Sequence, residues 1–387
     1  MKPSCIQVGI VGIGGYGRHL LEGLLDERQS TKLEIVSAVV VDPDRDREHL
    51  AFLKAHCPSA RIYRTCDALF KSAPSLDLLV LPVGIPAHKH LTLSGLKMGW
   101  NVLLEKPLAG SVTEGRAICE ADERSPHFVA LGYQDMYGSA VLEMKQAMLA
   151  GKIGRIRRIS ALAIWGRAKS YYDRNAWAGR LTLDGAPVFD SPFHNGLAHF
   201  LNMALVLAGD EQGNPATPLR ADAALFRAHD IESCDTSTIR WQTDSGTQVD
   251  IYFSHLTSKT VGPEVLIEGS EGSILWKGEE FWELRSGDGK AVRLPLQTTP
   301  ELRKAMLRRV LEKAGGAKAA VFTPRQSLAQ VQAVELAHAA TEIQTLSGEE
   351  LAGEADEWIE IPHLEEMLRA ARTDNRLLVG DSSKELR

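Results

Sequence analysis

The stretch that decides the fold runs from residue 6 to residue 17 and reads Ile-Gln-Val-Gly-Ile-Val-Gly-Ile-Gly-Gly-Tyr-Gly. Its first half predicts a buried strand, and leucines at helical spacing beyond residue 17 predict an amphipathic helix. A G-x-G-x-x-G pattern that lies between a strand and a helix indicates dinucleotide binding.

Each glycine of this pattern has its own physical task. Gly12 permits the tight turn, Gly14 lets the backbone approach a pyrophosphate, and Gly17 permits close packing of helix on strand. The phosphates would rest on the helix N-terminus, where N–H groups and the helix dipole favour anions. We expect these residues to contact the cofactor: Gly12, Ile13, Gly14, Gly15, Tyr16 and Gly17.

Asp42 ends the second predicted strand, residues 33–41. In this position a carboxylate accepts both ribose hydroxyls of NAD and repels the 2′-phosphate of NADP. Arg45 and Arg47 lie nearby and leave NADP open as the less favoured cofactor. The sequence therefore predicts NAD.

Strands and helices alternate up to residue 131. Strands are expected at 61–63, 77–81, 101–104 and 127–131, and helices at 45–55, at 86–98 and after the capping box of Ser111 and Glu114. This alternation predicts an α/β fold with a doubly wound parallel sheet. We expect this Rossmann domain to occupy residues 1–130.

The pattern changes in residues 131–387, which we expect to form a second domain. Ser191 and Pro192 predict the N-cap and first turn of a helix that lasts to Ala208. A strand at 155–165 and successive strands between 219 and 295 predict an antiparallel meander, so the class is α+β. Further helices are expected at 138–150, 300–313 and 325–345.

The composition excludes several classes of function. A length of 387 residues favours two domains, and a net charge of -6 argues against nucleic-acid or membrane-surface partners. No apolar run approaches the roughly 18 residues of a membrane span. Five scattered cysteines without paired spacing favour neither disulfides nor a metal site. With no signal-peptide pattern at residue 1, we expect a soluble cytoplasmic protein.

Glu105-Lys106-Pro107 follows the strand at 101–104, on the carboxyl edge where doubly wound sheets bind ligands. Pro107 restricts Lys106 to an extended backbone, and a cis Lys-Pro bond is plausible there. A lysine after a strand is exposed more often than catalytic, so these residues alone leave its role open.

Several motifs together resemble the Gfo/Idh/MocA oxidoreductase family. They are the glycine fingerprint, Leu81-Pro82 followed by His88, and the stretches at 99–109, 132–134, 151–154 and 268–272. The resemblance implies a Rossmann domain, a second domain with a large open sheet that often mediates dimers or tetramers, and an active site in the cleft between them. It implies that Lys106 holds the substrate hydroxyl near the nicotinamide and assists proton movement. Pro82, Glu105 and Lys106 are expected near the cofactor. His88 is expected either there or, as the favoured alternative, in a structural role at the start of a helix.

The family also has an Asp-x-Gly-x-His signature, from which this sequence departs. Asp190 and His194 share the expected spacing, and so do Asn195 and His199, but neither pair has the glycine. His199 lies at the family's usual distance from the helix-ending Gly209, so we favour it as acid/base. Asn195 would then replace the aspartate on the same helical face, and Asn202 a downstream acid. Asp190 and His194 remain the alternative pair.

The segment 171–180 combines aromatic and polar residues, as sugar sites require. We expect a carbohydrate or polyol to contact Lys106, His199, Tyr172, Arg174, Asn175 and Trp177. An ordered loop with Trp177 as a packed anchor is equally compatible.

The resemblance implies an NAD-dependent oxidoreductase that transfers hydride between nicotinamide and a carbohydrate or polyol carbon. Two alternatives are open. One is transient redox by bound NAD during sugar hydrolysis or epimerisation. The other is a non-catalytic sugar or nucleotide sensor, which the missing aspartate supports.

Overall fold

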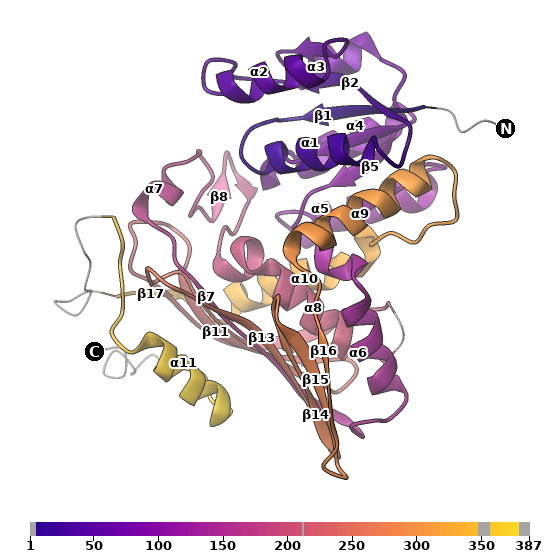
Figure 1. Cartoon of the computed structure of the whole chain (residues 1–387). Helices are drawn as coiled ribbons and strands as arrows, with labels where there is room; N and C mark the ends of the chain where they lie inside the picture. The colour runs from indigo at the N-terminus through magenta and orange to yellow at the C-terminus, as the bar shows by residue number, and fades with distance from the viewer. Residues whose placement is uncertain (1–4, 211–212, 347–356, 379–387) are drawn as a thin grey trace. The chain divides into compact units, whose positions relative to one another are not determined.

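The computed structural model describes residues 5–210, 213–346 and 357–378. Its contacts divide the chain into two compact units, which are shown in Figure 1. Unit 1 comprises the described residues up to Ala109, Thr113–Gly138 and Thr298–Arg325. Unit 2 comprises Gly110–Val112, Ser139–Gln297 and the described residues from Gln326 onward.

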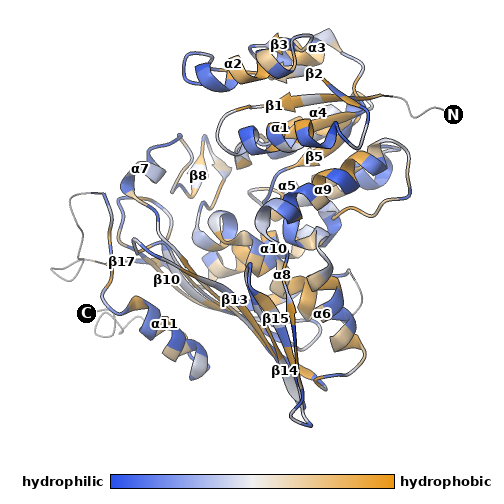
Figure 2. Ribbon diagram, in the orientation of Figure 1, coloured by the Kyte–Doolittle hydropathy of each residue, from blue (hydrophilic) through white to orange (hydrophobic). Residues whose placement is uncertain are grey.

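Unit 1 is built on a six-stranded sheet in the order β3-β2-β1-β4-β5-β6. Every neighbouring pair in it is parallel, which confirms the doubly wound α/β prediction. The strands are β1 (Ile6–Val11), β2 (Leu33–Val39), β3 (Arg61–Tyr63), β4 (Leu78–Leu81), β5 (Asn101–Leu104) and β6 (Val129–Leu131). β1 and β5 are hydrophobic along most of their length (Figure 2), and β4 is apolar and buried throughout, as strands covered on both faces must be.

The helices of unit 1 follow the predicted order, with one addition. The added helix is α3 (Cys66–Ser72), whose N-terminus is capped by the Thr65 side chain accepting from the Ala68 N–H. The others are α1 (Tyr16–Glu27), α2 (Arg47–His56), α4 (His88–Lys97), α5 (Val112–Arg124) and α9 (Thr299–Ala314), with short 3-10 turns η1 (Ile85–Ala87) and η2 (Gln134–Tyr137).

Helix α9 comes from late in the sequence but completes the core of unit 1. Its apolar face, residues 306–311, joins the hydrophobic cluster of β1, β2, β4 and α1. The two helices pack closely, since a Cβ at Gly23 of α1 would lie 2.5 Å from Leu307 of α9. Residues 298–325 therefore belong to unit 1 by their contacts, although they lie beyond the 1–130 range expected for this domain.

Unit 2 is built on a nine-stranded sheet in the order β16-β15-β14-β13-β7-β12-β11-β10-β17. Its strands are β7 (Ile156–Trp165), β10 (Pro218–Arg227), β11 (Thr236–Thr243), β12 (Gln248–Ser254), β13 (Thr260–Gly269), β14 (Gly272–Lys277), β15 (Phe281–Ser286), β16 (Ala291–Pro295) and β17 (Ile343–Thr345). A separate short hairpin pairs β8 (Thr182–Leu183) with β9 (Ala186–Pro187).

The sheet of unit 2 is mostly antiparallel, as expected, but it is not a simple meander. β7 lies between β13 and β12 and runs parallel to β12. The sequence patterns predicted where the strands form. They could not predict that β7 pairs with β12, because the paired residues lie about ninety positions apart in the sequence. The helix expected at 325–345 is also shorter: α10 (Pro324–Ala340) ends earlier, and Ile343–Thr345 pairs with β10 as an edge strand. β-branched residues at both ends of that segment favour the strand.

The continuous helix expected from Ser191 to Ala208 is wrong, because the structure divides this segment into a π-helical turn and a separate α-helix. Pro192–Gly196 forms a π-helical turn (η3), in which the Leu197 N–H donates to the Pro192 carbonyl. Leu197 leaves helical geometry, and α8 begins at Ala198 and ends at Ala208. The Ser191 hydroxyl makes no capping hydrogen bond. The wide turn has a packing reason, because a Cβ at Gly196 would lie 2.8 Å from the ring of His255.

Helices cover both faces of the unit 2 sheet (Figure 1). α6 (Ser139–Leu149), α8 and α10 lie on one face, and α11 (Leu364–Thr373) lies on the other. α11 was not expected from the sequence; its Leu364 and Leu368 pack on Leu162, Ile164 and Tyr252. A short helix, α7 (Lys169–Tyr172), lies in the loop after β7. No helix within the described ranges has the length and apolarity to cross a membrane.

Candidate functional site

The glycine loop of unit 1 has the geometry that its sequence requires. Gly12 has a φ of 89°, which only glycine adopts readily, and its N–H donates to the Val39 carbonyl. A Cβ at Gly17 would lie 2.5 Å from the Gly12 carbonyl oxygen and 3.2 Å from Pro82. Any larger residue would therefore push α1 away from β1. The predicted tasks of Gly12 and Gly17 are both visible in these contacts.

The N-terminus of α1 is open to an anion. No side chain caps it and no acidic residue lies in its first turn. At Gly15 a Cβ would meet no atom within 4 Å, so the loop faces open space there. Backbone N–H groups at such a terminus bind phosphate oxygens. These observations fit the diphosphate of a dinucleotide, and Ile13 is fully buried beneath the loop.

Asp42 lies at the expected place after β2 and is exposed. One carboxylate oxygen accepts the backbone N–H groups of Asp44 (3.2 Å) and Arg45 (3.0 Å). The carboxylate is thereby held by the turn, while its second oxygen makes no hydrogen bond with the residues that the structure describes. Sequence reasoning missed a second acid here: Asp46 Oδ1 lies 2.5 Å from the position of a Cβ on Gly14.

Glu105 and Lys106 lie beyond β5, and the Lys106–Pro107 bond is cis. The Glu105 side chain is buried, and one of its oxygens accepts the Lys106 N–H at 3.3 Å. Its carboxylate rests against Gly132, where a Cβ would lie 2.4 Å from Oε1. Burial raises the pKa of Glu105 to about 7, against the opposing effect of the Lys106 charge. Lys106 itself is half-buried.

Tyr16 and Arg303 extend this edge of unit 1. The Arg303 Nε donates to the Tyr16 hydroxyl at 3.3 Å, and its guanidinium lies over the Tyr16 ring. Burial and the nearby Glu105 carboxylate raise the pKa of Tyr16. Arg303 comes from α9, far from the fingerprint in sequence, and no local motif could have identified it.

His88 was expected at the cofactor or at the start of a helix, and the structure places it at the start of α4, with its ring between the loops after β4 and β5. The side chain is fully buried. Its Nδ1 lies 2.8 Å from the Pro107 carbonyl oxygen and its Nε2 lies 3.1 Å from that of Val83. Burial lowers the pKa of His88. In this geometry the ring ties the loop after β4 to the loop after β5, which supports the position of Lys106.

In unit 2, Asp190 and Asn195 form a hydrogen-bonded pair. The Asn195 Nδ2 donates to Asp190 Oδ1 at 2.8 Å. Asp190 Oδ2 accepts the Gly179 N–H at 2.7 Å and lies 3.6 Å from Arg174. Asp190 is buried, so its carboxylate ties the 174–179 loop to the π turn. Because of that turn, Asn195 and His199 do not share a continuous α-helix as the i, i+4 spacing had suggested.

Both candidate histidines are buried in unit 2. His199 and Asn202 are the two polar side chains of α8, whose residues are all buried. His194 lies in the π turn, and its Nδ1 is 3.3 Å from the Gln330 amide nitrogen of α10. His194 is fully enclosed, whereas His199 retains 9% exposure. The geometry within unit 2 therefore leaves His199 the more accessible of the two.

The predicted substrate segment forms an aromatic–guanidinium stack. The Arg174 guanidinium lies 3.5 Å from the Tyr171 ring centroid and 5.1 Å from that of Trp177. Asn175 Oδ1 accepts the N–H groups of Trp177 (3.0 Å) and Ala178 (2.8 Å). The Tyr172 ring lies 4.8 Å from that of His229.

Two buried histidines near this segment were missed by sequence reasoning. His229 Nδ1 lies 2.9 Å from Asp235 Oδ2. His255 Nδ1 donates to the Trp165 carbonyl at 2.7 Å, which leaves its Nε2 as an acceptor. Burial, aided by the nearby Arg167 charge, lowers the pKa of His255 to about 3 and keeps it neutral. Each of these histidines stands alone within a predicted strand, and no motif around it indicates its hydrogen-bond partner.

No group of three or more His, Cys, Asp or Glu side chains suited to a metal ion occurs within the ranges that the structure describes.

Comparison with known families matches both units. The family of NAD-binding Rossmann-fold oxidoreductases named GFO/IDH/MocA matches residues 6–133, and its C-terminal domain matches residues 141–275. Among curated relatives, D-apiose dehydrogenase from Paraburkholderia graminis is 24% identical over 72% of this chain and 70% of its own. Inositol 2-dehydrogenase 3 from Saccharopolyspora erythraea is 32% identical over 38% of this chain and 42% of its own. Several other relatives are matched over about half of their length.

Solved structures share the fold. The WlbA dehydrogenase from Chromobacterium violaceum, in complex with NADH and UDP-GlcNAcA, has a TM-score of 0.70 at 19% identity, covering 88% of this chain and 94% of that one. Levoglucosan dehydrogenase in complex with NADH has a TM-score of 0.70 at 14% identity, covering 87% and 98%. With a glycine loop open to a diphosphate, a lysine on the same sheet edge and matches to both domains, the chain belongs to the GFO/IDH/MocA family of NAD-binding oxidoreductases.

Proposed function

We propose that this protein is an NAD-dependent dehydrogenase that oxidises a hydroxyl-bearing carbon of a sugar or polyol. The observation that carries the proposal is the pairing of an uncapped α1 N-terminus with Lys106 on one sheet edge of unit 1. The relatives are named for dehydrogenation of apiose and inositol, which are both polyhydroxylated.

The residues of unit 1 would hold the cofactor in three places. Backbone N–H groups of the glycine loop would bind the diphosphate, and Asp42 would accept the adenosine ribose hydroxyls. Pro82 and Glu105 flank the carboxyl ends of β4 and β5, where the nicotinamide half would lie. When bound, NAD accepts the hydride.

Lys106 would hold the reacting oxygen and stabilise the charge that develops on it. The Lys106 backbone N–H donates to the Glu105 carboxylate, and this hydrogen bond anchors the loop that carries the lysine side chain. His199 would take the hydroxyl proton, because a histidine is suited to proton transfer near neutral pH. Asp190 and Asn195 would position the surrounding loop rather than exchange protons, since they are bonded to each other.

Neither alternative from the sequence is favoured by the relatives, which are named as dehydrogenases. A hydrolase or epimerase with transient redox would turn over without net NADH, and a sensor would bind NAD without turnover.

The test is to incubate the purified protein with NAD or NADP and a panel of sugars and polyols that includes apiose and myo-inositol. A dehydrogenase produces a rise in absorbance at 340 nm that scales with substrate consumed. Substrate conversion without net NADH, or NAD binding with no conversion across the panel, would each contradict the proposal. The expected dimer or tetramer and the expected cytoplasmic location stay predictions; light scattering and cell fractionation test them.

A further inference from the structure

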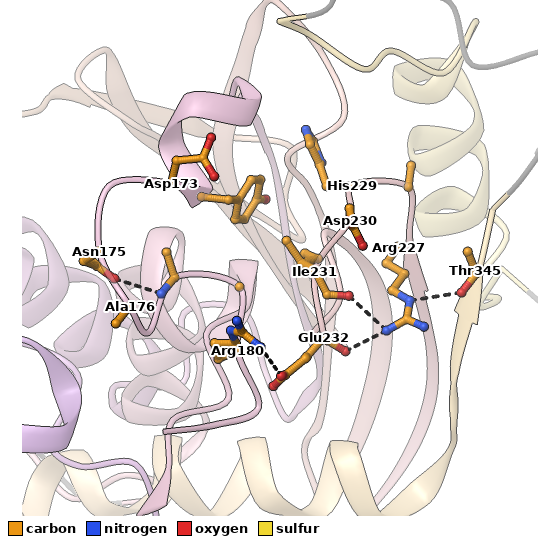
Figure 3. Close-up of a pocket in the computed structure, with 14 residues that line it drawn as sticks. Asp173, Asn175, Ala176, Arg180, Arg227, His229, Asp230, Ile231, Glu232 and Thr345 are labelled. Carbon is orange, nitrogen blue, oxygen red and sulfur yellow. Dashed lines mark hydrogen bonds and ion pairs between the residues drawn. The ribbon is translucent and has the colours of Figure 1, made fainter. Parts of the chain in front are cut away.

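A cavity of about 1010 Å³ lies within unit 2, between the 172–180 loop and the turn at 227–232 (Figure 3). Its walls come from that loop and from the turn at 227–232, with Thr345 of β17 at the edge. Ligand sites are typically about 300–1,000 Å³, so the volume suffices for a sugar with a substituent. None of the predicted catalytic residues lines it, but Tyr172 and Asn175 of the predicted substrate segment do.

The cavity contains a buried histidine held by a carboxylate. Asp235 Oδ2 accepts the backbone N–H groups of Ala228 and His229 and lies 2.9 Å from His229 Nδ1. His229 is 4% exposed, and its Nε2 has no hydrogen-bond partner among the described residues. A buried polar atom left unpaired is costly, which favours contact with a ligand hydroxyl. Because Nε2 is itself enclosed, that contact requires a shift of the side chains around it.

The cavity is lined by two arginines, Arg180 and Arg227, and by three carboxylates, and Arg227 is the arginine that forms no ion pair with a described residue. The Arg227 guanidinium donates to the carbonyls of Ile231 (2.9 Å) and Glu232 (3.1 Å) and to Thr345 Oγ1 (3.0 Å) (Figure 3). All three acceptors are neutral, and within the described part of the chain Arg227 forms no ion pair. Arg180 on the opposite wall differs, because it is paired with Glu232. The hydrogen bonds of Arg227 use Nε and Nη1, and Nη2 makes no hydrogen bond with the described residues, so it can donate to the carboxylate of a ligand.

The remaining lining suits hydroxyls and a sugar ring. Asn175 Oδ1 is occupied by two backbone N–H groups, which fixes the amide and leaves its Nδ2 as a donor. Asp173 and Asp230 are exposed carboxylates that accept from hydroxyl groups. The Tyr172 ring, tilted on His229, provides an apolar face.

We propose that this cavity binds a sugar acid, with its carboxylate on Arg227 and its hydroxyls on His229 and Asn175. The acid group distinguishes the ligand from a neutral sugar, and the hydroxyl contacts distinguish it from a simple carboxylate. The proposal concerns binding and stands whether or not the same sugar acid is oxidised.

Titration calorimetry of the full chain without NAD tests it, using D-glucuronate and its neutral isostere D-glucuronamide as probes. Wild-type protein should bind glucuronate at least about 10-fold more tightly than glucuronamide, since a hydrogen bond between arginine and a charged carboxylate is stronger than one to a neutral amide. Equal affinity for the two probes, or no heat from either, would overturn the proposal without any variant being needed.

Variants then locate the site. Arg227→Gln should remove the preference for glucuronate, Arg227→Lys should retain part of it, and His229→Phe should weaken both probes alike. The matched control is Arg293→Gln, on β16, which should leave both affinities unchanged. If Arg293→Gln and Arg227→Gln behave alike, the anion binds elsewhere. Lys106→Ala should leave glucuronate binding intact, because Lys106 does not line the cavity. Loss of dehydrogenase activity in this variant with unchanged glucuronate affinity would therefore show that the two proposals can fail independently.

Discussion

The glycine loop of unit 1 and the histidine-rich region of unit 2 are assembled in opposite ways. In unit 1 the proposed site consists of backbone N–H groups and one lysine after one strand, all within short stretches of sequence. In unit 2 the candidate residues are side chains from residues 167–179, 190–199, 229–235 and 255. Sites made by backbone can be recognised from local sequence, whereas sites assembled from distant side chains cannot.

The largest expected effect is that of Lys106→Ala. Loss of the group that holds the reacting oxygen should lower kcat by about 10²–10⁴-fold, as for other positioned proton-transfer groups. NAD affinity should stay within about threefold, because the diphosphate is bound by backbone. Stopped-flow absorbance and NAD titration measure the two quantities. A kcat within threefold of wild type would remove Lys106 from the chemistry.

His199→Asn and His194→Asn separate the two candidate bases. We expect His199→Asn to lower kcat by roughly 10²-fold and to abolish the acidic limb of its pH profile, as loss of a general base does. His194→Asn, at an enclosed position beside Gln330, should act mainly through stability. The opposite ranking in kcat would make His194 the base.

Asn195→Asp tests whether the family aspartate can be restored. The Asn195 amide donates to Asp190, so an aspartate there would place two carboxylates in contact. We expect a loss of about 2 kcal/mol in the free energy of unfolding near neutral pH, recovered in acid as one carboxyl protonates. Urea denaturation at several pH values measures it. A variant that is as stable as wild type and more active would show that Asn195 occupies the aspartate's catalytic place.

Glu105→Gln should change how stability depends on pH. A carboxyl whose pKa is raised on folding stabilises the fold fully below its unfolded pKa near 4.5, and this contribution is lost as the pH rises through about 7. Relative to wild type, Glu105→Gln should therefore gain on the order of 3 kcal/mol between pH 4.5 and pH 8. Parallel denaturant titrations would show no such divergence if Glu105 ionises normally.

Asp42→Ala should have the smallest effect, on cofactor choice. Removing the carboxylate ends its repulsion of the 2′-phosphate, so the NAD/NADP ratio of kcat/KM should fall by about 10-fold. Asp46→Ala is the matched comparison, because Asp46 lies beside Gly14. If Asp46→Ala shifts selectivity and Asp42→Ala does not, Asp46 is the acid at the ribose.

The sequence predicted most of unit 1 for a physical reason. Gly12 and Gly17 are required by a positive φ and by a contact that no Cβ tolerates, so their spacing carries structural information. Arg303 escaped prediction because α9 returns to unit 1 from more than 150 residues away. In unit 2 the π turn followed from the packing of Gly196 on His255, and the position of β7 followed from long-range pairing. Neither leaves a periodic pattern.

The most direct test of dehydrogenation follows the hydride itself. Sugars and polyols deuterated at their carbinol carbons, incubated with the protein and NAD, should yield NADH labelled at C4 of the nicotinamide, detected by NMR. The label should be absent with Lys106→Ala over the same time. Conversion of a deuterated substrate with no deuterium in the NADH, or no conversion of any, would contradict the assignment of this chain as an NAD-dependent dehydrogenase.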